Sequence, residues 1–587
     1  MLRQGSSAWV SHSGKELSAR SGLRTPTSSP RWCDLLPASA LHLWGLALVS
    51  LQVCETVNGP LMERLAGRCS FHDACCVDTL RHGAGIVKRL PCSGNGKPLE
   101  GVRECDVSSL LEKRAATNAQ ILSKLRADVH AEDLLKMTIA DAELGRMSWP
   151  RPISEADMHL ANMSPRFCIE QGLKPDGTPK LRAVDDFSKS LVNECVVASE
   201  KLKYDTLDAL LVTMRDMKSN SSAPLELFKI DIDSAYRRVP LKFEERQFAA
   251  VVFKVGDVSY IAEHYALPFG SLGSVHGWDR IGALLRFLGR KLLKLPLHRF
   301  VDDFMGAERQ GSAKIATETF VRLVKACLGN SSVAQRKVEW GNPLTVLGVR
   351  VSLTSSGAQF VPDDVKVAKW LARINKALSE KKLTCGEASK LSGALQWASQ
   401  YIFKRLGRAM LRPLIEHTYG RGFWRVRLEH CLEWWKQVLE LKISQERARH
   451  GSVQKPFHLS ADARSTPPRL AAVLICDGKF YYTEMAPPKE LLEVLVKRND
   501  NQIMGLEIMS IALGISSFSE LIKSRKVRVW SDNKGAEGCT RKGAAKSFDH
   551  NSLIHAFWLR AAQLRLEVFI SRVPTKDNIA DDPSRER

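Results

Sequence analysis

The stretch Arg299–Gly306 constrains the fold more than any other, because it places two adjacent aspartates between two short apolar runs. Apolar runs separated by two residues are typical of a β-hairpin. Asp302 and Asp303 suit the tip poorly, because a two-residue turn favours Asn-Gly or Asp-Gly and neighbouring carboxylates repel each other. An isolated Asp-Asp pair is most often a solvated turn. The alternative is a divalent-metal site, which needs a further carboxylate from elsewhere in the chain.

Residues 225–233 supply that carboxylate. The run Leu-Glu-Leu-Phe-Lys-Ile-Asp-Ile-Asp is typical of a strand that becomes apolar and then ends in acid. An aspartate at the end of a buried strand is costly unless it is paired or bound to metal. We therefore expect Asp231 to lie beside Asp302 and Asp303.

A basic strand precedes this acidic set. Lys180–Phe187 follows a turn containing Asp176 and Gly177, so it is expected to be the returning strand of a hairpin. Its Arg182 could grip a triphosphate as a fork and its Lys180 as a point charge, although a lone basic strand is more often a solvated edge. Leu267-Pro268-Phe269-Gly270 lies between the two acidic segments.

In this order the segments resemble the sequence blocks of a reverse transcriptase. The blocks span roughly 170 residues, an order that chance rarely produces: Arg182–Asp186, Asp231–Tyr236, Leu267–Gly270, Phe300–Asp303 and Val346–Gly348. The resemblance implies an α+β multidomain protein with a right-hand polymerase of fingers, palm and thumb. Its substrates would be dNTPs, an RNA template and a DNA primer.

The resemblance also assigns roles within the polymerase site. Two Mg²⁺ ions, or Mn²⁺ in their place, would be held by Asp231, Asp302, Asp303 and the carbonyl of Ile232. Tyr236 would lie under the incoming sugar and disfavour a 2′-hydroxyl, although an ordinary core tyrosine is the alternative. Arg182 would bind the triphosphate with help from Lys174 or Lys180, and Phe269 and Gly270 would allow template and nucleotide to approach the backbone.

The charge of the chain fits a nucleic-acid partner. Lys+Arg 86 against Asp+Glu 64 gives 86 − 64 = +22, a field suited to a polyanion, although a basic surface can also serve solubility alone. Residues 361–450 carry 18 Lys+Arg against 9 Asp+Glu and are almost wholly helical in pattern. This segment resembles a thumb and connection that grip the backbone of a primer-template. Four of its tryptophans are expected to be core residues rather than base-stacking groups: Trp397, Trp424, Trp434 and Trp435.

A second acidic set follows residue 456. It consists of a strand aspartate, a helix glutamate, an aspartate after a further strand and a late aspartate: Asp462, Glu507, Asp532 and Asp581. This order, with the closing stretch Asn578-Ile579-Ala580-Asp581-Asp582-Pro583-Ser584-Arg585, resembles a ribonuclease H domain on a mixed sheet. The four residues would hold two further metal ions and cut the RNA of an RNA–DNA hybrid. Two departures are Ser571-Arg572, where many relatives carry a mobile histidine, and Pro583 in place of leucine.

The expected domains follow from these assignments. They are a poorly defined leader (1–100), a helical extension (101–165), fingers and palm (166–362), a helical thumb and connection (363–455) and a ribonuclease H-like domain (456–587). The leader contains an apolar run too interrupted for a confident membrane span; it is a transit segment or a loosely ordered arm, and no stable membrane association is expected. The cysteines indicate an intracellular protein of nucleus or cytoplasm, with Cys69, Cys75 and Cys76 near His72 as a weak candidate metal knuckle.

The type of retroelement is less constrained by the sequence. Protease and integrase signatures are absent from the sequence, so a recombinase or integrase would be a separate chain. The F-V-D-D and D-D-F-S variants resemble polymerases of DIRS-like retrotransposons, with Gypsy-like and pararetroviral enzymes as alternatives among LTR-type elements. Two other functions stay open. One is a domesticated or decaying copy that only binds nucleic acid, and the other is a ribonuclease H with an inert palm.

Overall fold

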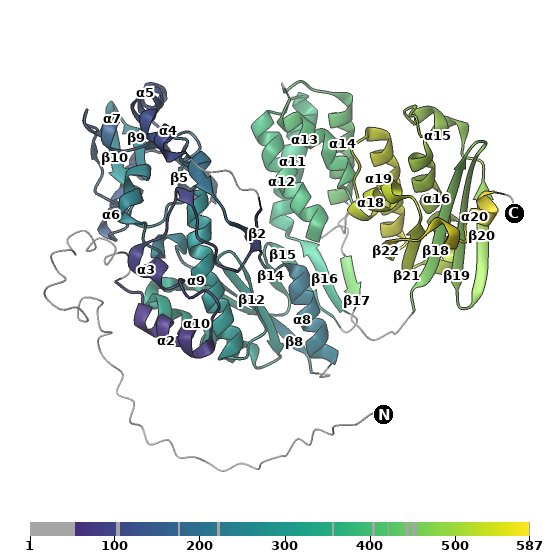
Figure 1. Ribbon diagram of the computed structural model, residues 1–587, viewed down its shortest axis with the longest axis horizontal. Helices are drawn as coiled ribbons and strands as arrows, with labels where there is room; N and C mark the ends of the chain where they lie inside the picture. The colour runs from purple at the N-terminus through teal and green to yellow at the C-terminus, as the bar shows by residue number, and fades with distance from the viewer. Residues whose placement is uncertain are drawn as a thin grey trace, which may run out of the picture.

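The computed structural model describes residues 53, 55–100, 106–173, 176–219, 223–354, 357–401, 406–420, 422–440, 445–448 and 455–585. Lys174 lies outside these ranges. The chain is a mixed α+β protein with several separate sheets, and three regions follow one another from left to right in Figure 1. Within the described ranges, each helix is too short or too polar to cross a membrane.

A four-stranded sheet, in the order β11-β12-β8-β13, carries the first acidic set. Alternate residues of a strand point to opposite faces, and β8 uses both: Phe228 and Ile230 join a core with α9 and α10, whereas Leu225 and Leu227 join a core with α8. The central strand is therefore buried on both sides. The elements are α8 (Leu207–Ser219), β8 (Leu225–Ile232), α9 (Leu272–Lys291), β11 (Leu297–Phe300), β12 (Asp303–Arg309), α10 (Ala313–Leu328) and β13 (Val333–Gly341).

Helix α10 ends at Leu328, and Gly329 follows this last helical residue with a φ of +88°. Ile315 and Phe320 of this helix do not share its packing face. Ile315 is 66% exposed, whereas Phe320 is fully buried. The five-residue step between them turns about 500°, which leaves their side chains on different sides of the helix.

A five-stranded sheet, in the order β3-β10-β9-β4-β5, lies beside the first. The predicted hairpin is present: β4 and β5 pair antiparallel, with Arg182 opposite Ile169 and Gly177 in the turn at a φ of +80°. Helices α5 and α6 pack against β4 and β9. The elements are α5 (Arg114–Lys124), α6 (Ala131–Glu143), β3 (Arg151–Pro152), α7 (Asp157–Leu160), β4 (Met163–Leu173), β5 (Pro179–Asp185), β9 (Ala250–Val255) and β10 (Val258–Glu263).

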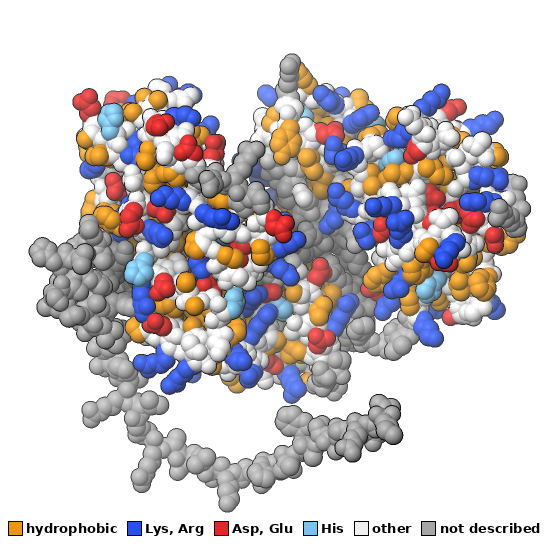
Figure 2. All heavy atoms as spheres, in the orientation of Figure 1, with side chains coloured by type: hydrophobic (Ala, Val, Ile, Leu, Met, Phe, Trp, Pro, Cys, Tyr) orange, Lys and Arg blue, Asp and Glu red, His pale blue; other side chains and the backbone are white. Residues whose placement is uncertain are grey.

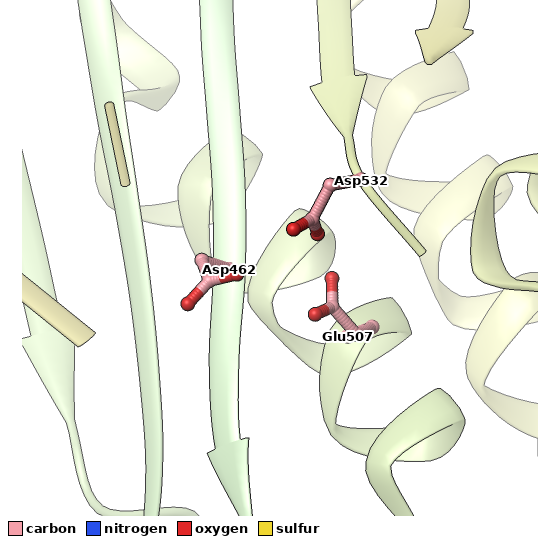
Figure 3. Close-up of side chains that lie close together, drawn as sticks. All are labelled: Asp462, Glu507 and Asp532. Atoms are coloured by element: carbon pink, nitrogen blue, oxygen red, sulfur yellow. The ribbon is translucent and has the colours of Figure 1, made fainter. Parts of the chain in front are cut away.

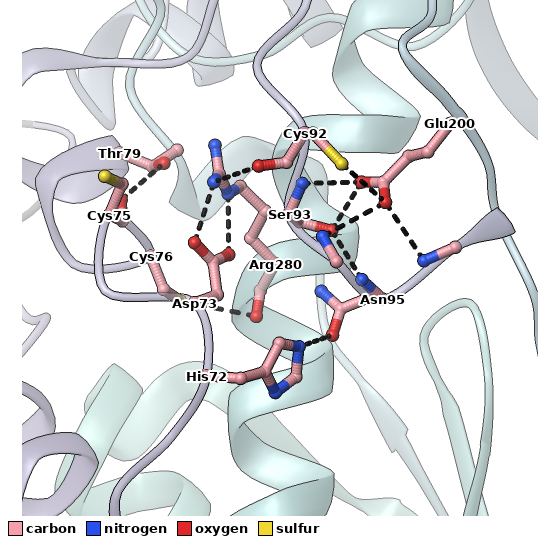
Figure 4. A network of polar contacts seen from close by, with 12 residues as sticks. His72, Asp73, Cys75, Cys76, Thr79, Cys92, Ser93, Asn95, Glu200 and Arg280 are labelled. Carbon is pink, nitrogen blue, oxygen red and sulfur yellow. Dashed lines mark hydrogen bonds and ion pairs between the residues drawn. The ribbon is translucent and has the colours of Figure 1, made fainter. Parts of the chain in front are cut away.

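Residues 57–98 are not a loose arm, which corrects that expectation for this part of the predicted leader. Met62 and Ile86 are fully buried in one core with α9. Asp73 makes two 2.7 Å contacts with Arg280 of that helix, and the pair is buried (Figure 4). The elements are α2 (Gly59–Cys69), α3 (Asp78–His82), β1 (Lys88–Arg89), β2 (Lys97–Pro98), α4 (Val107–Glu112), β6 (Val196–Val197) and β7 (Glu200–Lys201).

The cysteines of this region do not form the weakly predicted metal knuckle. Cys76 is buried and its thiol donates to the carbonyl of Arg280, whereas Cys75 is exposed. The His72 ring contacts Asn95 at 3.0 Å (Figure 4). Among the described residues, His72 and the cysteines do not converge as metal ligands.

The helical segment leaves a second four-stranded sheet and returns to it. After β14, β15 and β16, the chain forms four helices, and β17 then pairs with β16, a return that the helical pattern did not predict. Trp435 is fully buried, and Trp397, Trp424 and Trp434 pack against the same core, so their assignment to the core is confirmed. The elements are β14 (Leu344–Val346), β15 (Val349–Leu353), β16 (Gly357–Pro362), α11 (Asp364–Glu380), α12 (Cys385–Tyr401), α13 (Arg412–Thr418), α14 (Val426–Glu440) and β17 (Gln445–Ala448).

The last region is a mixed five-stranded sheet in the order β20-β19-β18-β21-β22. Strands β18 to β20 are antiparallel, and β21 and β22 run parallel to β18. The elements are β18 (Phe457–Ser465), β19 (Pro468–Cys476), β20 (Lys479–Met485), α15 (Lys489–Val494), α16 (Ile503–Ser517), α17 (Ser519–Ile522), β21 (Lys526–Ser531), α18 (Lys534–Lys542), α19 (Phe548–Gln563), β22 (Glu567–Arg572) and α20 (Asp581–Ser584).

The helical segment packs directly on this last region. Trp434 of α14 meets His555 of α19 edge to face, with ring centroids 4.6 Å apart, and Arg408 donates to the carbonyl of Lys542. Figure 1 shows α14 beside α18 and α19. Figure 2 shows many Lys and Arg side chains on the visible face, several of them gathered over α18 and α19.

Candidate active sites

The first site is built where β8 ends and β12 begins. Asp303 lies directly opposite Asp231, and the amide of Ile232 donates to the carbonyl of Asp302 at 3.3 Å. The turn is displaced from its predicted position: Phe300 pairs with Asp303, so the two turn residues are Val301 and Asp302. Pairing with both β8 and β11 makes Asp303 the first residue of a strand rather than half of a turn.

Two donors stabilise this turn. Val301 has a φ of +55°, an unusual conformation for a β-branched residue. Its carbonyl accepts from the Trp278 indole at 3.0 Å and from the Arg299 guanidinium at 2.8 Å. Both donors are buried side chains, so the position of Asp302 is set by the surrounding core.

Burial and mutual repulsion favour protons on the two aspartates. Burial, reinforced by Asp231, raises the pKa of Asp302, and burial with the charges of Asp302 and Asp231 raises the pKa of Asp303 to about 6. Lys337 lies 2.8 Å from Asp231 and neutralises part of that charge. Of the residues described, these three carboxylates do not bring one oxygen each within 4.8 Å of one another.

A row of stacked side chains extends from this site. The Arg182 guanidinium lies 4.5 Å from the Phe269 ring, which meets the Tyr236 ring edge-on at 5.3 Å. Burial, with the negative charge of Asp302, raises the pKa of Tyr236 to about 12. The row therefore extends from the basic strand β5 toward the acidic hairpin. Lys180 is exposed two residues before Arg182 on the same strand.

Gly270 is required where it stands. Its φ of +96° favours glycine, and a Cβ there would lie 2.2 Å from the carbonyl oxygen of Asp185. Asn193 reinforces this close approach, because its side chain donates to the Gly270 carbonyl at 2.9 Å and accepts from the Leu272 amide at 3.0 Å.

A buried charged network behind the row was not predicted. Arg237 donates to His264 Nδ1 at 2.7 Å, and His264 Nε2 lies 2.9 Å from the carboxylate of Asp185. Burial and the charge of Arg237 lower the pKa of His264 to about 4, so the ring is neutral at pH 7. Asp141 of α6 pairs with Arg237 at 3.1 Å. The residue spacings that reveal a helix or a strand cannot reveal this set, because its members come from separate elements.

The second site gathers three carboxylates. Asp462 on β18, Glu507 on α16 and Asp532 after β21 each place an oxygen within 4.8 Å of the others (Figure 3). Burial, with the charges of Asp462 and Asp532, raises the pKa of Glu507 to about 9. Burial likewise raises the pKa of Asp462 to about 6, although Ser584 opposes this. Such a cluster favours either protons or a divalent cation.

The closing motif supports the second site through residues that were not assigned a role. Asn578 donates to the carbonyl of Ala461 at 3.1 Å and to the Asp462 carboxylate at 3.4 Å, and the Ser584 hydroxyl donates to the other oxygen of Asp462. The signal was present in the sequence, because both residues belong to the closing stretch Asn578–Arg585 that carries the A-D and S-R pairs. The motif thus orients Asp462.

Asp581 stands slightly apart from this cluster. It raises the pKa of Asp462 by its charge, and it pairs with Arg585 at 2.7 Å. Asp582 is exposed, whereas Asp581 is half-buried. Of these two neighbouring aspartates, Asp581 is therefore the one whose charge acts on Asp462.

Comparisons with known proteins add a likeness of structure at low identity. No protein-family model matches the chain, and no curated protein matches it by sequence. A foamy viral protease-reverse transcriptase dRH in complex with double-stranded DNA aligns at 14% identity over 82% of this chain and 84% of that one, with a TM-score of 0.40. Two further structures of the foamy viral protease-reverse transcriptase also align. The complex with RNA/DNA hybrid aligns at 14% identity over 82% of this chain and 64% of that one, with a TM-score of 0.41. The complex with dsDNA aligns at 15% identity over 81% of this chain and 99% of that one, with a TM-score of 0.39.

Proposed function

We propose that this protein is an RNA-directed DNA polymerase with a separate nuclease site that cuts the RNA of an RNA–DNA hybrid. The observation that carries the proposal is the row from Arg182 through Phe269 and Tyr236 to the Asp231–Asp303 pair. In this row a guanidinium that could bind a triphosphate contacts an aromatic ring, and the next ring lies close enough to Asp302 to be affected by its charge. The second carboxylate cluster lies on another sheet, so each site can act alone.

The carboxylates of both sites fit Mg²⁺, which prefers oxygen ligands. In the first site Asp231, Asp302, Asp303 and the Ile232 carbonyl would hold two ions, and in the second Asp462, Glu507, Asp532 and Asp581 would do so; Mn²⁺ is the alternative. Bound ions would lower the pKa of the attacking oxygen and stabilise the leaving group. Lys337 contacts one oxygen of Asp231 at 2.8 Å, so an ion would bind the other oxygen or displace the lysine.

The protein's own residues would orient the substrates. Arg182 would bind the triphosphate, and the edge of Tyr236 would limit space at the sugar 2′-position and select dNTPs. The neutral His264 would fix Asp185 by donating from Nε2, and Asp185 in turn adjoins Gly270. In the nuclease site Asn578 and Ser584 would hold Asp462 in one orientation.

A primer-extension assay tests the polymerase. Purified protein with Mg²⁺, dNTPs and a primed RNA should extend the primer, and Asp302→Asn should abolish extension while hybrid cleavage persists. Asp462→Asn should give the reverse pattern. Loss of both activities in either variant would contradict two separate sites.

One observation favours a second candidate, cleavage without extension. Of the described residues, only the second carboxylate set brings three oxygens within 4.8 Å. If this candidate is correct, the wild-type protein cuts the hybrid and adds no nucleotide. A retroelement of LTR or DIRS-like type, acting with a recombinase or integrase on another chain, remains the proposed biological setting.

A further inference from the structure

The C-terminal sheet has one face that carries aromatic side chains in cross-strand register. The first row across the five strands is Phe480, Ile475, His458, Arg528 and Phe569, and the second is Tyr482, Val473, Ser460, Trp530 and Ser571. Residues directly opposite each other on paired strands point to the same face. We call these ten residues the aromatic face.

Helix α16 packs on the opposite face, where Gly514 approaches Leu459 and Ala472. On the aromatic face, α20 packs near Asp462 through Ser584. Val473 and Ser460 in the middle of the second row are buried, whereas the edges of the face are open: Tyr482 is 71% exposed, Phe480 69% and Phe569 45%. Three large aromatic side chains on one sheet face thus lie in solvent, at both edges of the sheet.

In the middle of the face, two aromatic rings lie beside the guanidinium of Arg528. The rings of His458 and Trp530 stack at 6.0 Å with an interplanar angle of 10°, and the Arg528 guanidinium lies 5.5 Å from the Trp530 ring. No ion pair of Arg528 occurs among the described residues. The two rows contain no acidic residue, and the nearby Glu484 is already paired with Arg469 at 2.8 Å.

We propose that the aromatic face binds single-stranded nucleic acid. Bases would stack on Phe480, Tyr482 and Phe569, and a backbone phosphate would meet Arg528. Stacking on exposed aromatic rings together with an uncompensated cation is how proteins bind single strands without reading their sequence. Four strand spacings of about 4.8 Å make the face roughly 19 Å wide, enough for several nucleotides.

The face is connected to the nuclease site by one strand. His458, Ser460 and Asp462 alternate along β18 and so share a side, and four residues of strand place His458 about 13 Å from Asp462. A single strand on the face could therefore run toward the cleavage site. The proposal concerns binding alone and does not require either carboxylate site to be active.

Photo-cross-linking of the full-length chain tests this. The probes are a 12-residue oligouridylate carrying 5-iodouridine and the matching oligothymidylate carrying 5-iododeoxyuridine, both in EDTA so that no reaction occurs. Mass spectrometry should find cross-links in peptides of β20, β21 and β22 with one or both probes. The two probes distinguish RNA from DNA as the preferred strand.

The double variant Phe480→Ala/Tyr482→Ala should lower labelling of the β21 and β22 peptides at least about fivefold, the loss expected from one base–aromatic stack. Both side chains are mostly exposed, so the variant should keep the wild-type melting temperature. Tyr419→Ala, at a side chain 87% exposed outside the face, should leave labelling unchanged. Labelling confined to other regions, or unchanged in the double variant, would overturn the proposal. So would a wild-type dimer that the double variant abolishes, because that outcome assigns the face to a protein partner.

Discussion

Glu507→Gln is expected to remove most of the proton release that accompanies Mg²⁺ binding to the second carboxylate site. Burial and the charges of Asp462 and Asp532 raise the pKa of Glu507 to about 9. At pH 7 such a group is about 99% protonated, and an ion that needs the carboxylate must displace close to one proton. Asp462, with a pKa of about 6, is only about 10% protonated at pH 7 and contributes little.

The size of the effect follows from the same pKa. Because pH 7 lies two units below this pKa, displacing the proton weakens the apparent binding free energy of the ion by about 3 kcal/mol. The apparent affinity should therefore rise about tenfold per pH unit until pH 9. Without metal, folding stability changes with pH in the opposite direction. The stability that the raised pKa of Glu507 contributes is fully present below the ordinary pKa of a glutamate, and it is lost as the pH rises toward 9.

Isothermal titration calorimetry of the full-length chain measures the released protons, in two buffers that differ in ionisation enthalpy. The matched control is Glu520→Gln, at an exposed glutamate of the same region, which should behave like the wild type. Fewer than about 0.3 protons released by the wild type, or equal release from Glu507→Gln, would refute the assignment of a protonated Glu507.

Three further substitutions test other parts of the structure. Gly270→Ala should raise the KM for dNTPs and lower the melting temperature, because its Cβ would meet the Asp185 carbonyl at 2.2 Å. The control is Gly256→Ala, which is also at positive φ but has open space around it, so its effects should be limited to backbone strain. Equal effects of the two variants would argue against a role for the close approach. Asp73→Asn leaves Arg280 buried without a charged partner and should lower stability by about 3–5 kcal/mol in denaturant unfolding, whereas Arg412→Ala at an exposed pair with Glu416 should change it by about 0.5 kcal/mol or less. Tyr236→Ala should increase incorporation of ribonucleotides relative to deoxyribonucleotides in primer extension, and an unchanged ratio would assign the ring to the core alone.

The sequence predicted the elements of both sites because each depends on local pattern. Asp231 lies near the end of β8 and Asp462 lies within β18, each after apolar residues, and Asp303 begins β12. The Asp477-Gly478 turn between β19 and β20 has both residues at positive φ, as a two-residue hairpin requires. The position of the Asp302 turn was wrong by one residue. Its register depends on pairing with β8, about 70 residues earlier in the sequence.

The charged side chains that support the sites could not be predicted in this way. Asp141, Arg166, Asp185, Arg237 and His264 meet only after two sheets and α6 have packed together, and a lone buried charge has no local signal. The same reason explains residues 57–98. Their apolar residues have little periodicity, and their partner is a helix about 200 residues later in the chain.

By itself, the sequence determined which aspartates lie in or beside strands, the order of the two acidic sets and the residues of the closing motif. Only the tertiary structure decided which carboxylates converge, that Asn578 and Ser584 orient Asp462, and that three aromatic residues of the last sheet stay exposed. The physical reason is the distance along the sequence over which each effect acts. Strand and turn preferences act over a few neighbouring residues, whereas burial, pKa and the distance between two carboxylates depend on every element packed around them.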